Sequence, residues 1–182
     1  MEDVLMDQDG ADPESSPLTV LYIEEALRRS FLFSPQLCNE PENWVAKIHK
    51  ELGILEEQLP ETIYARAYES RMDLLIAVIV GPQGTPYQGG LFLFDVCFPS
   101  NYPASPPLLH YHSGGLAINL SLFKSGEVCL EVPTQSGGLE SMWVPGMTTM
   151  LQLLVSIQNR ILNVDPLFNE LAYATMKGSS YG

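Results

Sequence analysis

The stretch LLIAVIVGPQGTPYQGGLFLFDVCF, which runs from Leu74 to Phe98, contains two apolar segments separated by a turn rich in glycine and proline. In the second segment, Leu91–Phe98, side chains alternate with the period of two expected of a pleated strand, which places Cys97 as a strand side chain. Turn residues such as those of Gly81–Gly90 typically join antiparallel strands. The stretch therefore predicts two neighbouring strands of an antiparallel sheet.

Further strand candidates lie on both sides of this pair. Ile63–Tyr68 precedes it, and Leu108–His112 follows a proline-rich path, Phe98–Pro107, whose prolines impose an extended and irregular backbone. No helical pattern interrupts the four segments. Their order predicts a four-stranded antiparallel meander.

Helical patterns flank the predicted sheet. Apolar residues recur every four positions in Val20–Phe33, and a second helix is expected from Pro41 to Pro60. Its apolar face would be Trp44, Ile48, Leu52 and Leu55, and its charged face Glu42, Lys47, Lys50, Glu51, Glu56 and Glu57. A last helix is predicted over Met147–Leu162, and the aperiodic segment Ser113–Pro145 is expected to be a long functional loop. This order predicts an α+β domain with the helices on one face and one end of the sheet.

Composition restricts the classes of partner. The 182 residues suit one domain plus some tail, and nine basic against 22 acidic residues give a net charge of −13, which would repel nucleic acid and anionic lipid. Six acids and no Lys or Arg precede Thr19, so we expect residues 1–19 to form a disordered acidic tail without a specific partner. The longest apolar run, Leu74–Val80, is too short to span a membrane. We expect a soluble intracellular protein, cytoplasmic or alternatively nuclear.

The three cysteines, Cys38, Cys97 and Cys129, are widely spaced and include no CxxC pair. A disulfide framework or structural zinc site is therefore not expected, and neither is a cofactor. Cys129 alone has surroundings typical of a site, because it follows the turn Ser125-Gly126 and precedes a loop. We expect any chemistry of this chain to use its sulfur.

Four ordered motifs connect the chain to a family. They are Gly84-Thr85-Pro86-Tyr87-Gln88-Gly89-Gly90, then Phe98-Pro99 with Tyr102-Pro103 and Pro106-Pro107, then Gly126-x-Val128-Cys129-Leu130, then Trp143-x-Pro145. Over about Pro41 to Ala174 the chain resembles the ubiquitin-conjugating enzymes. His110–Leu116 and Phe168-Asn169-Glu170 look closest to the plant branch of large hybrid conjugating enzymes, some of which serve phosphate homeostasis. The resemblance implies a conjugating domain over residues 40–175, behind a short helical extension at 20–39 and before a tail at 176–182.

The resemblance implies that Cys129 accepts the ubiquitin C-terminus as a thioester from an ATP-dependent activating enzyme. It would then pass ubiquitin to a substrate lysine or to a ligase. A free thiol has a reference pKa of about 8.5, but transfer of an acyl group from a thioester to a thiol is nearly balanced, because the leaving group is also a thiolate, and it needs no paired histidine. A protease-like Cys–His pair is the alternative, with His49, His110 and His112 as candidate bases.

The sequence departs from the family motif before the cysteine. Members usually carry His-Pro-Asn or Asn-Pro-Asn there, and this chain has Asn119-Leu120-Ser121. The resemblance assigns Ser121 to the place of the Asn that supports the oxyanion, and the loss of such a donor typically costs about 10²–10³ in rate. Ser121 as an ordinary loop residue is equally open, and Asn119 is expected to shape the turn.

The resemblance also assigns an acceptor-side role to Asp165, which precedes Pro166 and matches the family's acidic gate. A carboxylate there can orient the incoming amine and help it lose a proton. A solvated loop acid is the alternative reading.

Ligase docking is implied at the first helix of the conjugating domain and at two loops. The candidates are Lys47, Lys50, Tyr102, Pro103, Ala104 and Pro145. Ala104 stands where many members have a bulky aromatic residue, which predicts weaker or different ligase contacts. Thr134–Gly138 also departs from the family sequence, which leaves its loop geometry open.

Three readings remain open. The first is a ubiquitin-conjugating enzyme that acts through Cys129. The second is a catalytically impaired module that keeps the fold and binds ubiquitin or a ligase, which the serine at Ser121 favours. The third is a fragment of a hybrid enzyme that lacks its substrate-binding regions.

Overall fold

The structure, a computed structural model, describes residues 42–68, 71–134 and 136–174. The expected acidic tail, the helix at Val20–Phe33 and the tail at 176–182 lie outside these residues. The elements follow the order α2 (Glu42–Gln58), β1 (Ile63–Tyr68), β2 (Arg71–Val80), β3 (Leu91–Cys97), β4 (Leu108–Tyr111), β5 (Glu131–Pro133), β6 (Leu139–Ser141), α3 (Met150–Ser156), η2 (Ile157–Ile161), η3 (Pro166–Asn169) and α4 (Leu171–Ala174).

The predicted meander is confirmed. Strands β1 to β4 form one sheet in sequence order, and every neighbouring pair is antiparallel. The β2–β3 pair has unbroken register from Val80 opposite Leu91 to Leu74 opposite Cys97. This register points Phe92, Phe94 and Val96 to the same face of the sheet, where they are buried.

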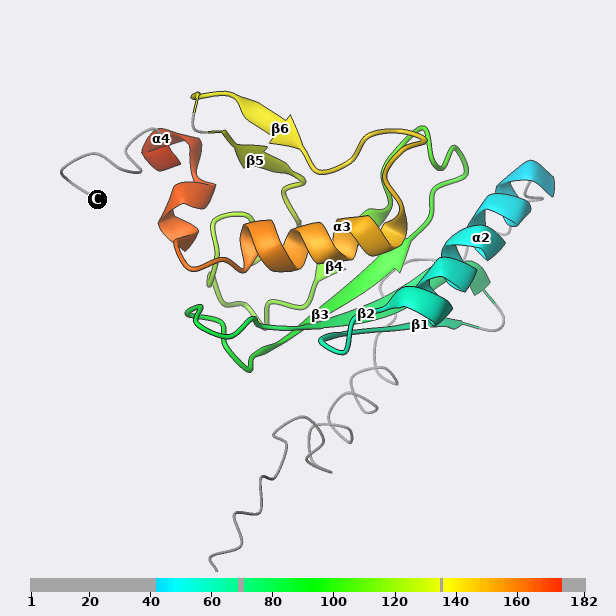
Figure 1. Ribbon diagram of the computed structural model, residues 1–182, viewed down its shortest axis with the longest axis horizontal. Coiled ribbons are helices and arrows are strands. Elements are labelled where there is room, and N and C mark those ends of the chain that lie inside the picture. The colour runs from blue at the N-terminus through cyan, green and yellow to red at the C-terminus, as the bar shows by residue number, and fades with distance from the viewer. Residues whose placement is uncertain (1–41, 69–70, 135, 175–182) are drawn as a thin grey trace, which may run out of the picture.

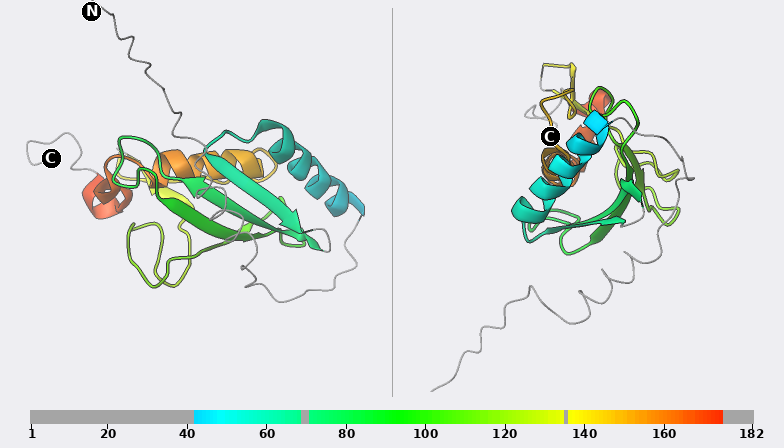
Figure 2. Two further views of the ribbon diagram at one scale, coloured as in Figure 1. Left: turned by 90° about the horizontal axis from the view of Figure 1, so that it is seen from below. Right: turned by 90° about the vertical axis from the view of Figure 1, so that its right-hand side faces the viewer.

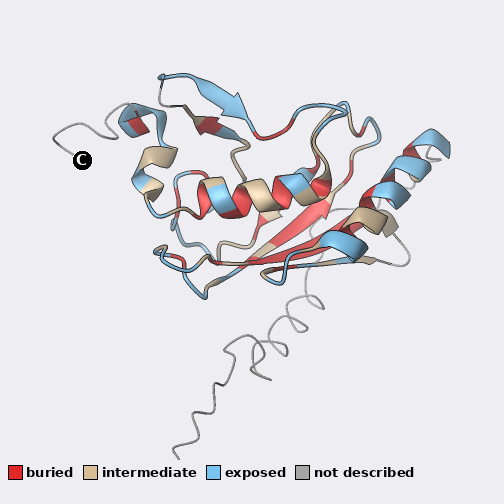
Figure 3. Ribbon diagram, in the orientation of Figure 1, coloured by how far each residue is buried: buried red, intermediate tan, exposed pale blue. Residues whose placement is uncertain are grey.

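Helices α2 and α3 lie on the same side of the curved sheet, as Figures 1 and 2 show. Met150, Leu153 and Leu154 of α3 are fully buried in the cluster that also contains Phe94 and Val96. Figure 3 shows buried residues on α3 and along the strands of the sheet. Removal of this apolar surface from water is the main force that holds the helices on the sheet.

One residue of α2 was assigned to the wrong face. Trp44, Ile48 and Leu55 are buried as expected, but Glu51, predicted on the charged face, is only 9% exposed. Its carboxylate accepts hydrogen bonds from the Tyr102 hydroxyl at 2.7 Å and from the Met150 backbone N–H at 2.8 Å. The helical period places Glu51 beside the apolar face, and only the tertiary fold supplies the two donors that make its burial tolerable.

The proline-rich path Phe98–Pro107 is held by two tryptophans. Trp44 donates to the carbonyl of Pro99 at 2.8 Å, and Trp143 donates to the carbonyl of Pro103 at 3.4 Å. The rings of Tyr102 and Trp143 also contact each other, with centroids 5.4 Å apart. This path therefore has a defined course, although it lacks the backbone pairing of a strand.

The segment Ser113–Pro145 was expected to be one long loop, but part of it is regular. It contains the antiparallel hairpin β5–β6, whose turn is closed by Thr134. The Thr134 N–H donates to the carbonyl of Gly138 at 2.8 Å, and its hydroxyl accepts from the Gly138 N–H at 3.0 Å. Strands of three residues are too short to give a periodic signal in sequence.

The last predicted helix, Met147–Leu162, is shorter and less regular than expected. Thr149 caps α3 in a capping box with Gln152, so the helix begins at Met150. From Ile157 the backbone continues as the π-helical turn η2, in which Leu162 N–H donates to the Ile157 carbonyl at 3.2 Å. No helix among the described residues is long and apolar enough to cross a membrane.

Candidate active site

The segment that ends at Cys129 folds back on itself. The Cys129 backbone N–H donates to the Ser121 carbonyl at 2.9 Å, and Leu122 forms an antiparallel bridge with Val128. Leu122 is fully buried, so the two arms are anchored to the core near their base. This arrangement fixes the position of the Cys129 backbone.

Strand β4 supports the turn between the two arms. Gly126 has a φ of +95°, and a Cβ placed there would lie 2.0 Å from the His110 ring. The Tyr111 N–H donates to the Gly126 carbonyl at 2.7 Å. Only glycine fits both this backbone conformation and the close approach of the ring. The Ser-Gly turn seen in the sequence therefore has a packing role three residues before the cysteine.

The Cys129 sulfur is partly exposed and lies 3.3 Å from the backbone carbonyl of Glu131, to which the thiol donates. His112 instead pairs with the buried Asp95 at 2.9 Å, and His110 packs on Gly126. Among the described residues no histidine hydrogen-bonds to the Cys129 sulfur. The geometry therefore does not support the protease-like Cys–His alternative.

Asn119 and Ser121 are both buried, at 8% and 2% exposure. The Asn119 amide donates to the Tyr87 hydroxyl at 2.7 Å and to the Ile161 carbonyl at 2.8 Å, and its oxygen accepts from the Ser121 N–H at 2.8 Å. Burial raises the pKa of Tyr87, although the hydrogen bond from Asn119 opposes that shift. Asn119 thus holds the turn before Cys129, and the amide is occupied by internal partners.

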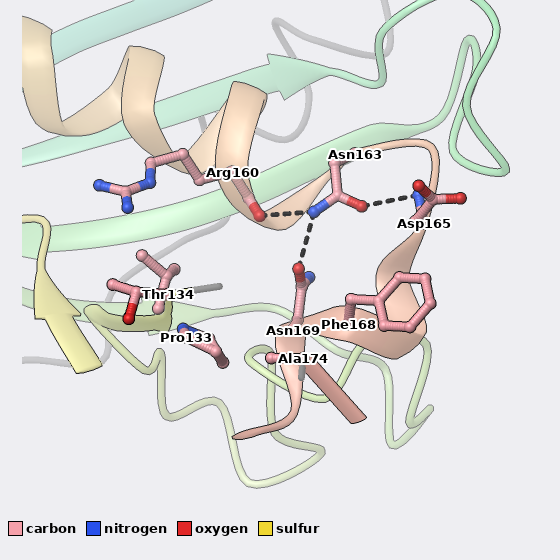
Figure 4. A pocket seen from close by; sticks show the side chains of 9 residues that line it. Pro133, Thr134, Arg160, Asn163, Asp165, Phe168, Asn169 and Ala174 are labelled. Atoms are coloured by element: carbon pink, nitrogen blue, oxygen red, sulfur yellow. Dashed lines mark hydrogen bonds between the residues drawn. The ribbon is translucent and has the colours of Figure 1, made fainter. Parts of the chain in front are cut away.

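Asp165 lies between η2 and η3, where its backbone N–H donates to the Asn163 side-chain oxygen at 2.8 Å. It is one of the residues that surround a pocket of about 220 Å³ beside β5, shown in Figure 4. The rest of the lining is Val132, Pro133, Thr134, Arg160, Asn163, Phe168, Asn169 and Ala174. Two residues of β5, Val132 and Pro133, line the pocket, and β5 begins two residues after Cys129. The pocket therefore borders the strand that follows the cysteine.

Arg160 supplies the positive charge at this pocket. Its guanidinium forms an ion pair of 2.6 Å with Glu140 of β6, and both side chains are partly exposed. Figure 4 shows the guanidinium directed away from Asp165. The ion pair connects the β5–β6 hairpin to the end of the last long helix, but as an exposed pair it adds little stability.

The candidate docking residues differ in how far they are exposed to solvent. Lys47 and Lys50 are exposed on α2, and Ala104 and Pro145 are exposed on two loops, whereas Pro103 is partly buried. The Tyr102 ring is only 3% exposed, and burial together with the bond to Glu51 raises its pKa well above the ordinary range. The Tyr102 hydroxyl is therefore used inside the protein.

No group of three or more His, Cys, Asp or Glu side chains within the described ranges is arranged to hold a metal ion.

Sequence reasoning missed two residues that the structure brings to this region. Asn163 donates to the Asn169 side-chain oxygen and to the Arg160 carbonyl, both at 2.7 Å, and Asn169 donates to the Ile161 carbonyl at 2.8 Å. Neither lies in a periodic element. Two signals were available: Asn163 directly follows a predicted helix, where side chains often bind the last carbonyls, and Asn169 lies in Phe168-Asn169-Glu170, which was quoted for its family resemblance without a role.

Comparison with known proteins gives one family. The family described as "Ubiquitin-conjugating enzyme" matches residues 47–179. In Arabidopsis thaliana, "Probable ubiquitin-conjugating enzyme E2 25" is 56% identical over 141 residues, which are 77% of this chain and 23% of that protein. "Putative ubiquitin-conjugating enzyme E2 39" is 55% identical over 78% of this chain and 45% of its own length. The chain therefore spans less than half the length of these relatives.

Solved structures agree in fold. The human ubiquitin-conjugating enzyme E2 G1 superimposes with a TM-score of 0.51 and 23% identity over 63% of this chain and 90% of its own. A conjugating enzyme E2 from Plasmodium falciparum gives a TM-score of 0.52 and 23% identity over 62% of this chain and 93% of its own. At such identities these structures support the α+β fold alone. On the family match and the two plant relatives, the chain belongs to the ubiquitin-conjugating enzyme family.

Proposed function

We propose that this protein is a ubiquitin-conjugating enzyme that carries ubiquitin as a thioester on Cys129. The observation that carries the proposal is the cysteine itself. Its backbone is fixed by the bond to Ser121, and its partly exposed thiol donates a hydrogen bond to the Glu131 carbonyl. A positioned thiol that is not hydrogen-bonded to a histidine suits transfer of an acyl group from a thioester to a thiol, which needs no strong base.

The proposed reaction has two balanced steps. In the first, the Cys129 thiolate attacks the thioester carbonyl of the charged activating enzyme, and that enzyme's cysteine leaves as a thiolate. In the second, a lysine amine attacks the Cys129 thioester, the Cys129 thiolate leaves, and the amine loses a proton as the amide forms. A ligase cysteine can replace the amine, in which case a second thioester forms.

Asp165 is proposed to act on the acceptor lysine. The residue is partly exposed and lies by the pocket next to β5, the strand that Cys129 leads into. A carboxylate on that side can orient an amine and accept its proton. Ser121 and Asn119 are proposed to act through the loop, because both are buried and bonded to its backbone.

A ligase or activating enzyme is proposed to dock on a surface formed by Ala104 and Pro145 together with Lys47 and Lys50 of α2, all of which are exposed. Tyr102 is proposed to support this surface from beneath, because its ring is buried. With Ala104 in place of an aromatic anchor, we expect the ligase contact to rely on other residues. Because the chain corresponds to 23% and 45% of the length of the two plant relatives, we further propose that it is the conjugating part of a larger enzyme. A cytoplasmic or nuclear location is a separate proposal.

The rival proposal is a module that binds ubiquitin or a ligase without efficient transfer. The observation that favours it is Ser121, since a hydroxyl stands where the family places an amide donor. A charging reaction separates the two proposals. The protein is incubated with activating enzyme, ATP and ubiquitin, and the products are compared on reducing and non-reducing gels.

The enzyme proposal expects a ubiquitin adduct that reductant removes. Cys129→Ser should give an adduct that resists reductant, because an oxyester is not cleaved by thiols as a thioester is. Cys97→Ala is the matched control and should charge like the wild type, since Cys97 is a strand side chain. Charging that survives in Cys129→Ala would refute the assignment, and a wild type that never charges would favour the binding module.

A further inference from the structure

Three asparagine side chains connect the segment of Asp165 to the segment of Cys129. The Asp165 N–H donates to the Asn163 oxygen at 2.8 Å, the Asn163 amide donates to the Asn169 oxygen at 2.7 Å, and the Asn169 amide donates to the Asn119 oxygen at 3.4 Å. The Asn119 oxygen also accepts from the Ser121 N–H at 2.8 Å, and the Ser121 carbonyl accepts from the Cys129 N–H at 2.9 Å. Figure 4 shows the hydrogen bonds of this connection around Asn163. The residues come from three separate stretches of sequence.

We propose that Asn169 is a positioning residue for transfer of ubiquitin from Cys129 to lysine. This proposal rests on the proposed function. Asn169 lies in the middle of the connection, since its amide donates to Asn119 and to the Ile161 carbonyl while its oxygen accepts from Asn163. It thereby sets the acceptor side of the site relative to the cysteine side.

The end of the last long helix explains why an amide is needed here. The Ile161 carbonyl lies at the end of the π-helical turn η2, where carbonyls lack a partner in the helix. Two side-chain amides, from Asn119 and Asn169, both donate to it at 2.8 Å. The same carbonyl therefore holds both loops. π-helical turns are often found next to functional sites.

Loss of Asn169 leaves the buried groups around it with other partners. Without Asn169, the Ile161 carbonyl still accepts a hydrogen bond from Asn119, and the Asn119 oxygen still accepts one from the Ser121 N–H. The Asn163 amide still donates to the Arg160 carbonyl. A buried group that retains a partner avoids the larger cost of an unsatisfied one. Substitution of Asn169 is therefore expected to loosen the two loops relative to each other without preventing folding.

Small displacements of reacting groups can reduce a rate by about 10²-fold. We therefore expect Asn169→Ala to charge within about twofold of the wild type, and to discharge to free lysine about tenfold more slowly. Under single turnover the maximal discharge rate should fall while the lysine concentration at half-saturation changes little. A variant that is merely less stable would instead lose charging and discharge together.

Two further variants sharpen the test. Asn169→Asp keeps the oxygen that accepts from Asn163 but faces the Ile161 carbonyl with another acceptor, so it should be at least as slow as Asn169→Ala. Asn159→Ala is the matched control, because Asn159 is exposed on the same turn η2, and it should behave as wild type. If Asn169 acts by placing Asp165, the double variant with Asp165→Ala should discharge no more slowly than Asp165→Ala alone.

Amide hydrogen exchange tests the connection without any charging. The Ser121 N–H donates to Asn119 and the Asp165 N–H donates to Asn163. In Asn169→Ala these two N–H groups should exchange about tenfold faster, while exchange of the β2 amides should not change. Unchanged exchange at both positions would overturn the proposal, and so would a fully additive double variant. Failure of the wild type to charge would count against the proposed function, whereas the exchange result would still decide the role of Asn169.

Discussion

Two polar clusters lie at opposite ends of the α3–η2 helix, and they are built differently. The Glu51 cluster consists of the Glu51 carboxylate with the Tyr102 hydroxyl and the Met150 N–H at the start of α3. The asparagine cluster consists of Asn119, Asn163 and Asn169 around the Ile161 carbonyl at the end of η2. The first is centred on a charge, and the second is made only of neutral amides.

The difference follows from what each side chain can donate and accept. A carboxylate only accepts, so Glu51 collects two donors at one point and joins residues up to 99 positions apart. An amide both donates and accepts, so amides can be linked in series. We infer that the Glu51 cluster stabilises the fold and that the asparagine cluster aligns the site.

The largest expected effect on stability is that of Glu51→Ala. It leaves the Tyr102 hydroxyl and the Met150 N–H buried without an acceptor, so the free energy of unfolding should fall by about 3 kcal/mol. Urea unfolding measures the change, and Glu57→Ala, exposed on the same helix, should stay within about 0.5 kcal/mol of wild type. The folded fraction should still transfer ubiquitin normally. A selective loss of transfer would break the division between the two clusters.

The next effect concerns transfer. Asp165→Ala should charge almost normally but discharge to lysine up to about 10²-fold more slowly, the order typical of losing a general base. The defect should shrink as the pH rises toward 10, because free lysine, with a reference pKa of about 10.4, then becomes neutral without help. Discharge is measured at pH 7 and 9.5. Equal slowing at both, or a loss of charging, would remove Asp165 from the acceptor side.

Tyr102→Phe should lower the free energy of unfolding by about 1 kcal/mol, since Glu51 keeps the Met150 N–H as a donor. Burial raises the pKa of Tyr102, so the folded protein keeps it protonated while the unfolded chain ionises near pH 10. Its contribution is therefore full below pH 10 and is lost as the pH rises above it. Unfolding at pH 8 and 10.5 should show a shallower alkaline decline in the variant, and Tyr173→Phe, a partly exposed control, should not.

The smallest effect is expected for Ser121→Asn. It should speed discharge to lysine by about threefold while charging is unchanged, because a carboxamide reaches further than a hydroxyl toward developing charge. Ser121 is 2% exposed, so the longer side chain should also cost about 1 kcal/mol of stability. Discharge within about twofold of the wild type, with charging also unchanged, would contradict the proposal that position 121 limits lysine attack.

The meander and the cysteine turn could be predicted because their signals are local. Strand β3 alternates along its length, and Gly126 and Cys129 lie three positions apart in one segment. Glu51 was placed on the wrong face because its two donors come from other parts of the chain. The β5–β6 hairpin was missed because three-residue strands show no period.

By itself the sequence determined the four strands of the meander, helix α2 and which sulfur stands at a turn, because side-chain periodicity and turn chemistry act between near neighbours. Only the tertiary structure decided that Asn119 and Asn169, 50 positions apart, share the carbonyl of Ile161. It also decided that Glu51 is buried. The asparagine contacts depend on how a helix end packs against two loops, and the burial of Glu51 depends on donors from distant parts of the chain, neither of which neighbouring residues in the sequence specify.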